Sequence, residues 1–165
     1  MSIIIPTYNE RENIKSLISE IKKYISVNDD IIVVDDNSPD RTYELIQELS
    51  KLDSSVKLIH RTNESGLTTA ILTGIRASDK EVVLWMDADF SHPPSLIPEL
   101  AKQMDKYDIV VASRYVKGGK DDRGLWIHGL LSLLLNKLCS LIFSDKVTDW
   151  TSGYICVKKK VVEQL

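Results

Sequence analysis

Short apolar segments alternate along this chain with segments of helical periodicity, and no other feature restricts its fold as strongly. Five brief runs are rich in β-branched residues: 3–5, 31–34, 56–59, 82–86 and 109–112. Runs of this length and composition are typical of parallel strands that are buried on both faces of a sheet. We therefore expect these five segments to form strands.

The segments between these runs carry the pattern of amphipathic helices. The first apolar face consists of residues at helical spacing: Ile14, Leu17, Ile18, Ile21 and Ile25. Asn9 and Glu12 stand ahead of this face in the arrangement of a capping box. A similar face covers residues 43–52, and we expect two more helices at 67–77 and 95–104.

A repeated order of strand and helix predicts an α/β fold with a mostly parallel sheet and flanking helices. The 165 residues suit a single domain, 1–165. In such folds, ligands bind outside the carboxyl ends of the strands. The polar motifs of this chain follow residues 5, 34, 86 and 112, each at the end of an expected strand.

Composition excludes some classes of function. A formal net charge of −3 gives no electrostatic basis for binding nucleic acid, since nucleic-acid-binding domains carry a basic surface. Cys139 and Cys156 lie among apolar residues without the spacing of a metal site or a redox motif, which favours a reducing compartment. The chain starts without the pattern of a signal peptide, so we expect it to be cytoplasmic.

Asp87 and Asp89 follow an apolar run and precede Pro93. Side chains two residues apart point to the same side of a strand, so the two carboxylates could converge on one cation. Carboxylate oxygens suit Mg²⁺ or Mn²⁺, which take their remaining ligands from water and from substrate phosphates. The alternative is an ordinary turn, because aspartate is a common turn residue.

Two later segments differ from the rest. Residues 117–124 are polar and rich in glycine, which indicates a loop. Residues 125–143 are strongly apolar but are interrupted by His128, Asn136 and Lys137. These interruptions argue against a membrane span and leave two interpretations, a helix in the membrane interface or a helix packed in the core.

Five motifs, in order along the chain, resemble those of the inverting family-two glycosyltransferases: Ile5-Pro-Thr-Tyr-Asn-Glu10, Val33-Val-Asp-Asp-Asn-Ser-Pro-Asp40, Met86-Asp-Ala-Asp-Phe-Ser-His-Pro-Pro94, Ser113-Arg-Tyr115 and Asp149-Trp-Thr-Ser-Gly-Tyr154. The Asn-Ser-Pro-Asp and His-Pro-Pro elements are similar to the dolichyl-phosphate mannose synthase branch, which moves a hexose from a nucleotide sugar to a polyprenyl phosphate. The resemblance covers nearly the whole chain. It implies a glycosyltransferase A-type fold, with a nucleotide-binding half at 1–90 and an acceptor-side half at 91–165.

The resemblance also implies roles for individual residues. Six positions match those that hold the nucleotide sugar: Pro6, Tyr8, Glu10, Val34, Asp36 and Asp87. Asp87 and Asp89 match the metal motif, and Arg114 matches a basic residue that approaches the phosphates. Asp149 matches a base or an acceptor-positioning group, so the candidate catalytic residues are Asp89, Asp149 and Arg114. The ordinary alternatives are packing for Tyr8 and turn or helix-end roles for Glu10, Asp36 and Asp149.

Departures from the family pattern affect the phosphate contacts. Ser91 stands where a glutamine often helps with the metal, and Ile155 and His128 stand where arginines are expected. A neutral residue replaces neither the charge nor the forked donors of an arginine. We hypothesise that Lys117, Lys120 and Arg123 supply the missing charge. The chain also ends earlier than family members usually do, so we expect an incomplete acceptor side.

The function implied is metal-dependent, inverting transfer of mannose or glucose from a GDP-linked or UDP-linked sugar to polyprenyl phosphate. An acceptor phosphate is largely a dianion near neutral pH and needs no strong base, and His92 is interpreted as a structural residue. Residues 125–143 would place the protein peripherally on the cytoplasmic face of a membrane. Two alternatives remain, a glycosyltransferase that uses a saccharide hydroxyl acceptor and a non-catalytic nucleotide-binding homologue.

Overall fold

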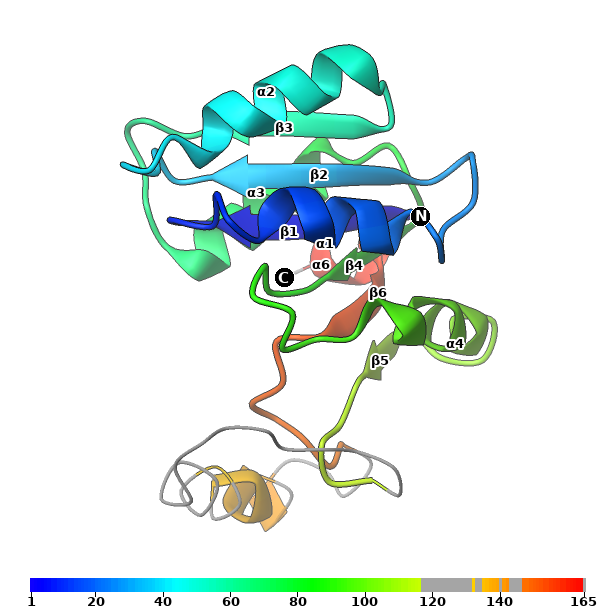
Figure 1. The fold of residues 1–165 in the computed structure, drawn as a ribbon. Helices are drawn as coiled ribbons and strands as arrows, with labels where there is room; N and C mark the ends of the chain where they lie inside the picture. Colours follow the sequence, from blue (N-terminus) through cyan, green and yellow to red (C-terminus); the bar gives the residue numbers. More distant parts are fainter. Residues whose placement is uncertain (117–131, 133–134, 140, 143–146, 165) are drawn as a thin grey trace.

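The computed structural model describes residues 1–116, 132, 135–139, 141–142 and 147–164. Its centre is a sheet of six strands in the order β3-β2-β1-β4-β6-β5 (Figure 1). The strands are β1 (Ser2–Thr7), β2 (Asp30–Asp35), β3 (Val56–His60), β4 (Val82–Trp85), β5 (Ile109–Val111) and β6 (Ile155–Lys158). The first four pair in parallel, and β6 runs antiparallel to both β4 and β5.

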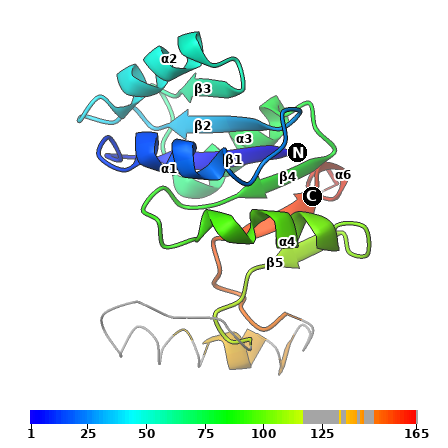
Figure 2. The same ribbon diagram turned by 45° about the vertical axis from the view of Figure 1, so that its right-hand side comes forward.

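Helices cover both faces of the sheet (Figures 1 and 2). The helices are α1 (Ile14–Ile21), α2 (Thr42–Leu52), α3 (Leu67–Ala77), α4 (Ile97–Gln103) and α6 (Lys159–Val162), with a 3-10 turn, η1 (Pro94–Leu96), before α4. Apolar side chains from α1, α2 and α4 form one core layer with the sheet, and those from α3 and α6 form the other. The predicted α/β fold with a mostly parallel sheet is therefore confirmed.

The buried strands explain why the chain folds in this way. Ile3 and Ile5 point into the layer under α1, whereas Ile4 points into the layer under α3, so the isoleucine run of β1 fills both cores. Each fully buried side chain of this size contributes about 1.5–3 kcal/mol through the hydrophobic effect. The central strand is therefore also the main source of apolar contacts.

Three sequence predictions need correction. The chain contains β6, which was not expected, because its four residues are too short to show a clear alternation next to the lysines that follow. The capping box is wrong: α1 begins at Ile14, and Asn9 adopts a left-handed conformation with φ of 61°. The fourth helix is divided into η1 and α4, since Pro98 lacks the backbone N–H that would bond to the Pro94 carbonyl in a continuous helix.

Candidate active site

The ends of several strands meet at one edge of the sheet. The parallel strands β1, β2 and β4 end there, β5 ends there as well, and the antiparallel β6 begins there. The chain leaves β1 for β2 and β3 and then returns to pair β4 with β1, which makes β1 and β4 a topological switch point. Ligands of open α/β sheets bind outside the carboxyl ends of the strands at such a point.

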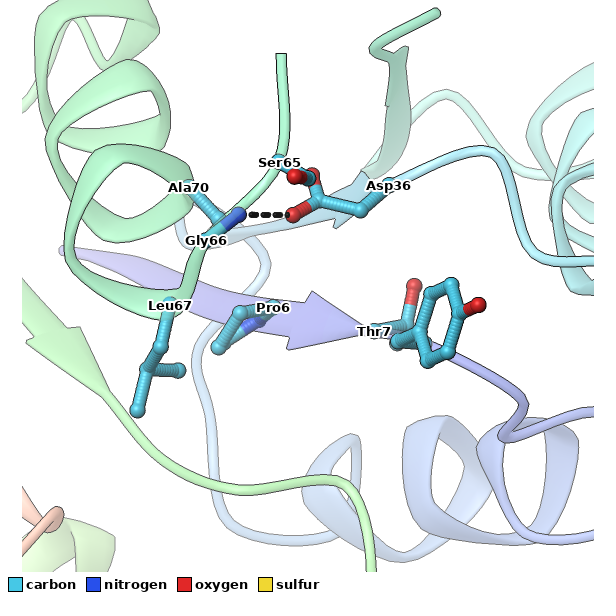
Figure 3. A pocket seen from close by; sticks show the side chains of 8 residues that line it. Pro6, Thr7, Asp36, Ser65, Gly66, Leu67 and Ala70 are labelled. Carbon is cyan, nitrogen blue, oxygen red and sulfur yellow. Dashed lines mark hydrogen bonds between the residues drawn. The ribbon is translucent and has the colours of Figure 1, made fainter.

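A pocket of about 410 Å³ opens beside β1 and β2 at this edge (Figure 3). Its lining consists of Pro6, Thr7, Tyr8, Asp36, Ser65, Gly66, Leu67 and Ala70. The first three come from the end of β1, Asp36 follows β2, and the others belong to the loop before α3 and to its first turn. Tyr8 is 61% exposed, so its ring stands at the rim where a flat ligand can contact it.

Asp36 is held rigidly on one wall of this pocket. Its Oδ1 accepts a hydrogen bond of 2.6 Å from Arg61 Nε, and its Oδ2 accepts one of 2.8 Å from the backbone N–H of Gly66. The Arg61 side chain is only 5% exposed and also pairs through Nη2 with Asp36 Oδ1. The carboxylate is thereby fixed between the end of β2 and the start of α3.

Asp35, the preceding residue, is fully buried and fixes the ends of β1 and β2. Its Oδ2 accepts hydrogen bonds from Thr7 Oγ1 at 2.9 Å and from Ser38 Oγ at 2.6 Å. Its Oδ1 accepts one from the Ser38 backbone N–H at 2.9 Å. Because neighbouring residues of a strand point to opposite sides, this inward-facing carboxylate leaves Asp36 facing the pocket.

Asp87 and Asp89 lie in a turn just beyond β4, which ends at Trp85. Phe90 has a φ of 63°, a left-handed conformation that is rare for a bulky residue and common at functional turns. The turn is stabilised because Asp89 Oδ1 accepts a 2.9 Å hydrogen bond from the Ser91 backbone N–H. The two carboxylates are therefore presented by a strained turn and not by a continuing strand.

The electrostatics of this turn suit a cation. Burial raises the pKa of Asp87, and the negative charge of Asp89 raises it further, whereas His92 opposes this. Burial also disfavours the charged form of Asp89, but hydrogen bonds from Ser91 outweigh it and lower the pKa of Asp89. A divalent ion between the two oxygen-bearing side chains would relieve their repulsion, so these residues fit Mg²⁺ or Mn²⁺.

Among the residues that the structure describes, no group of three or more histidine, cysteine, aspartate or glutamate side chains could hold a metal by itself. Two carboxylates therefore need further ligands from a substrate, as is usual for Mg²⁺ bound with a diphosphate. The space beside Asp87 is narrow, since a Cβ at Gly153 would lie 3.2 Å from Asp87 Oδ2 and 3.2 Å from His92 Cε1.

His92 supports the turn from behind. Its Nδ1 accepts a 3.0 Å hydrogen bond from the Asp87 backbone N–H, so the proton of the neutral ring is on Nε2. Burial lowers the pKa of His92, although the nearby carboxylates oppose this shift. The ring also stacks on Tyr154 with centroids 5.0 Å apart. These contacts agree with the structural role that the sequence predicted for His92.

Arg114 and Asp149 form an ion pair beyond β5. Arg114 Nε lies 2.8 Å from Asp149 Oδ2, and Arg114 Nη2 lies 2.8 Å from Asp149 Oδ1 and 2.7 Å from Thr151 Oγ1. Asp149 is 1% exposed. Burial disfavours its charged form, but the hydrogen bonds from Arg114 outweigh burial and lower the pKa of Asp149. A carboxylate whose pKa is lowered is less suited to act as a base than a carboxylate with an ordinary pKa.

Asn136 connects the apolar segment to this ion pair. The Asn136 side chain is buried, its Oδ1 accepts a 2.5 Å hydrogen bond from the Trp150 backbone N–H, and its Nδ2 lies 3.3 Å from Thr151 Oγ1. Leu138, Leu141 and Ile142 of the same segment are more than half exposed. In the described part of the chain, no helix has the length and apolar character needed to cross a bilayer.

The structure distributes the predicted site residues unevenly. Pro6, Tyr8 and Asp36 line the pocket, whereas the Val34 side chain is fully buried in the core under α3. Glu10 is outside the pocket lining, and its Oε2 accepts a 2.9 Å hydrogen bond from Asn13 Nδ2. Four residues lie outside the described part of the chain: Lys117, Lys120, Arg123 and His128.

Sequence reasoning missed part of the pocket wall. It did not single out Arg61, Gly66 or Ala70, which hold or line the pocket. A signal was present, because a Ser-Gly pair directly before a helical pattern marks a helix start where backbone N–H groups are exposed. The role of Arg61 had no such signal, since it depends on which strands are neighbours.

The sequence of this chain is similar to those of known proteins. A family model described as Glycosyl transferase family 2 matches residues 2–165. A dolichol-phosphate mannosyltransferase from Pyrococcus furiosus is 42% identical over 99% of this chain and 47% of its own length. A polyprenol monophosphomannose synthase from Mycolicibacterium smegmatis is 35% identical over 99% of this chain and 63% of its own length. The chain therefore spans about half to two thirds of these relatives.

Solved structures share the fold. Glucosyl-3-phosphoglycerate synthase from Mycobacterium tuberculosis, in complex with UDP, superposes with a TM-score of 0.72 at 19% identity and covers 99% of this chain and 58% of that one. A mannosyltransferase from Pyrobaculum calidifontis, in complex with GDP-mannose and Mn²⁺, gives a TM-score of 0.67 at 21% identity, over 99% of this chain and 45% of that one. At these identities the likeness supports the fold alone.

Proposed function

Because the chain belongs to glycosyl transferase family 2, we propose that it transfers a hexose from a nucleoside-diphosphate sugar to a polyprenyl phosphate with inversion at the anomeric carbon. The sugar that we favour is mannose, carried by GDP, since both curated relatives are named for mannose transfer to polyprenyl carriers. The observation that carries the proposal is the arrangement of three groups along one sheet edge: the pocket, the Asp87–Asp89 turn and the Arg114–Asp149 pair.

The first step is donor binding. The base and ribose occupy the pocket, where Tyr8 flanks the base and Asp36 accepts a hydrogen bond from the ligand. Pro6 contributes an apolar contact beneath them, and the assignments to Glu10 and Val34 stay predictions that their side-chain positions do not favour. The pocket lies beside β1, so a donor bound there extends its diphosphate toward the end of β4.

Asp87 and Asp89 would hold Mg²⁺ or Mn²⁺ against this diphosphate. The bound ion supplies positive charge that stabilises the leaving nucleoside diphosphate. The residues of the chain position it, because the Ser91 backbone fixes Asp89 and His92 fixes the backbone of Asp87. Ser91 itself contributes through its backbone N–H, so the absence of a glutamine at this position leaves the support of Asp89 in place.

The acceptor phosphate would bind at the other end of the site, beside Arg114. A polyprenyl phosphate arrives largely as a dianion near pH 7 and can attack the anomeric carbon without a base. Arg114 would donate hydrogen bonds to a phosphate, and Asp149 fixes the orientation of its guanidinium. We therefore assign Asp149 a positioning role, since its lowered pKa does not suit proton abstraction. That reasoning also disfavours a saccharide hydroxyl acceptor, which needs a base.

Asp149 neutralises much of the Arg114 charge, so further cations would help to bind the acceptor. Lys117, Lys120 and Arg123 remain the proposed source of that charge. Leu138, Leu141 and Ile142 expose apolar surface on the same segment that carries Asn136, which supports a peripheral contact with a membrane at 125–143. The carrier lipid would then reach the site from that side.

The test of this function is a transfer assay with three donors, GDP-mannose, UDP-glucose and UDP-N-acetylglucosamine, and with polyprenyl phosphate in detergent. We expect Mn²⁺-dependent transfer of mannose to the lipid phase, with a product of inverted configuration by NMR. Transfer only to a saccharide acceptor would establish the second interpretation. Donor binding by calorimetry without transfer to any acceptor would establish a non-catalytic homologue.

A further inference from the structure

Arg61 is the only lysine or arginine that is buried in the described part of the chain, and the function proposed above gives it no role. Its side chain is 5% exposed and lies directly after the edge strand β3. Burying a charged group costs several kcal/mol unless it is paired and hydrogen-bonded. The partners that pair with Arg61 are held close to one arrangement by it, so its contacts indicate what it positions.

The contacts of Arg61 all lead to the pocket wall. Nε donates to Asp36 Oδ1 at 2.6 Å, Nη1 donates to Thr69 Oγ1 at 3.0 Å, and Nη2 donates to the Gly66 carbonyl at 3.1 Å. Nη1 also lies 3.5 Å from Glu64 Oε2. One guanidinium therefore ties the end of β2, the loop before α3 and the first turn of α3 together.

Gly66 completes a closed network of hydrogen bonds with Asp36 and Arg61. Its N–H donates to Asp36 Oδ2 at 2.8 Å (Figure 3). Its carbonyl accepts from Arg61 and from Thr69 Oγ1. Gly66 has a φ of 129°, which only glycine adopts readily, so its two peptide groups can face Asp36 and Arg61 together. The pocket wall formed by Ser65, Gly66 and Leu67 thus depends on Arg61.

This network also limits the number of hydrogen bonds that Asp36 can accept from a ligand. A carboxylate has about four acceptor positions. Arg61 Nε occupies one on Oδ1, with Nη2 in ion-pair contact with the same oxygen, and Gly66 occupies one on Oδ2. A single acceptor position on Oδ2 is left for a donor group inside the pocket.

We propose that Arg61 is a positioning residue for the nucleotide base: it holds Asp36 and the Ser65–Leu67 wall in the geometry that binds the base. This inference rests on the proposed function, because it takes the pocket to be the base site. Arg61 does not touch the base itself. Its effect on nucleotide affinity passes through Asp36 and through this wall, and it has no effect on the diphosphate end of the site.

Calorimetric titration of the chain with GDP, with UDP and with inorganic pyrophosphate, each with Mn²⁺, tests this inference. We expect Arg61→Met to weaken the affinity for the preferred nucleotide by about tenfold or more, as for loss of a hydrogen bond to a charged group. Arg61→Lys keeps the charge but not the forked donors of the guanidinium, so its loss of nucleotide affinity should be intermediate. Pyrophosphate, which carries no base, should bind all variants equally.

Two comparisons separate positioning from general loss of structure. In an Asp36→Ala background, Arg61→Met should weaken nucleotide affinity by a smaller factor than in the wild-type background, because Asp36, one of the two groups through which it acts, is gone. Arg76→Met is the matched control, since Arg76 is an exposed residue of the last turn of α3. This variant should bind nucleotide as the wild type does. Thermal unfolding of each variant shows that the fold persists.

Wild-type affinity in Arg61→Met would overturn the inference and leave the proposed function intact. Equal weakening of nucleotide and pyrophosphate binding would also overturn it, because the effect would then be global. A wild-type chain that binds neither nucleotide would overturn both the inference and the proposed function.

Discussion

Single residues in this site owe their properties to neighbours that are distant in sequence. Asp149 has a lowered pKa because Arg114 lies beside it, and Asp36 is fixed because Arg61 and Gly66 reach it from the next strand and helix. Residue types and spacing predicted the Asp87–Asp89 pair and the structural role of His92, and the family resemblance implied Pro6, Tyr8 and Asp36, which line the pocket. They could not predict Arg61 or the pairing of Arg114 with Asp149, because both depend on strand order.

The Arg114–Asp149 pair predicts a pH dependence of stability. The folded pKa of Asp149 is depressed, so the pair stabilises the fold above the unfolded pKa of about 3.9 and loses this contribution as pH falls through the folded value. We expect Asp149→Asn to lower the free energy of unfolding by about 3 kcal/mol at pH 7. Urea unfolding between pH 7 and pH 3 should show the two proteins converging in acid, and a constant difference would contradict the assignment.

Cys156 predicts a pattern of thiol reactivity. Burial raises its pKa to about 12, so its thiol stays protonated at pH 8 and is inaccessible as well. We expect a chromogenic disulfide reagent to titrate at most Cys139, which is half-buried, in the folded protein and both cysteines in urea. Two fast-reacting thiols in the folded chain would show that β6 is not packed as described.

At the scale of elements, the order of strands was only partly predictable. The five β-branched runs and the helix expected at 67–77 were predicted, and each is found in the structure. The antiparallel β6 gave none, because it is short and is followed at once by α6. Its position between β4 and β5 is nonetheless what brings Gly153 and Asp149 to the same edge as Asp87.

Two glycines that contact different elements give contrasting predictions. A Cβ on Gly74 of α3 would lie 2.5 Å from Ile4 Cγ2 in the core, so Gly74→Ala should destabilise the fold by about 1–3 kcal/mol. Chemical denaturation measures this loss. Unchanged stability would mean that α3 does not approach β1 as closely as the structure shows.

Gly153→Ala should instead act on the site. The added methyl group would press on Asp87 Oδ2 and His92 Cε1 from 3.2 Å, and the half-exposed Asp87 side chain can move away. We expect the main defect to be a smaller enhancement of nucleotide binding by Mn²⁺. The free energy of unfolding should change by less than about 1 kcal/mol. A stability loss as large as that of Gly74→Ala, with normal Mn²⁺ dependence, would contradict this picture.

In the whole molecule, the fold places three groups of residues in a row along one edge of the sheet. The pocket lies at β1 and β2, the acidic turn at β4, and the ion pair at β5, and the order of strands sets their order in space (Figure 1). Under the proposed function, a donor bound in the pocket would therefore meet the acidic turn before it met Arg114. The sequence motifs predicted that these groups share an edge, because polar residues follow the expected strands. Only the fold shows the order of the groups along that edge.

The claim on which this account depends is that Asp87 and Asp89 hold a donor diphosphate through a divalent ion. Its most direct test is the affinity for GDP, measured by calorimetry with and without Mn²⁺, in the wild type and in Asp89→Ala. We predict that Mn²⁺ tightens GDP binding at least about tenfold in the wild type and has no effect in Asp89→Ala, whose unfolding midpoint is unchanged. Equal GDP affinity with and without Mn²⁺ in the wild type, or full Mn²⁺ enhancement in Asp89→Ala, would contradict it.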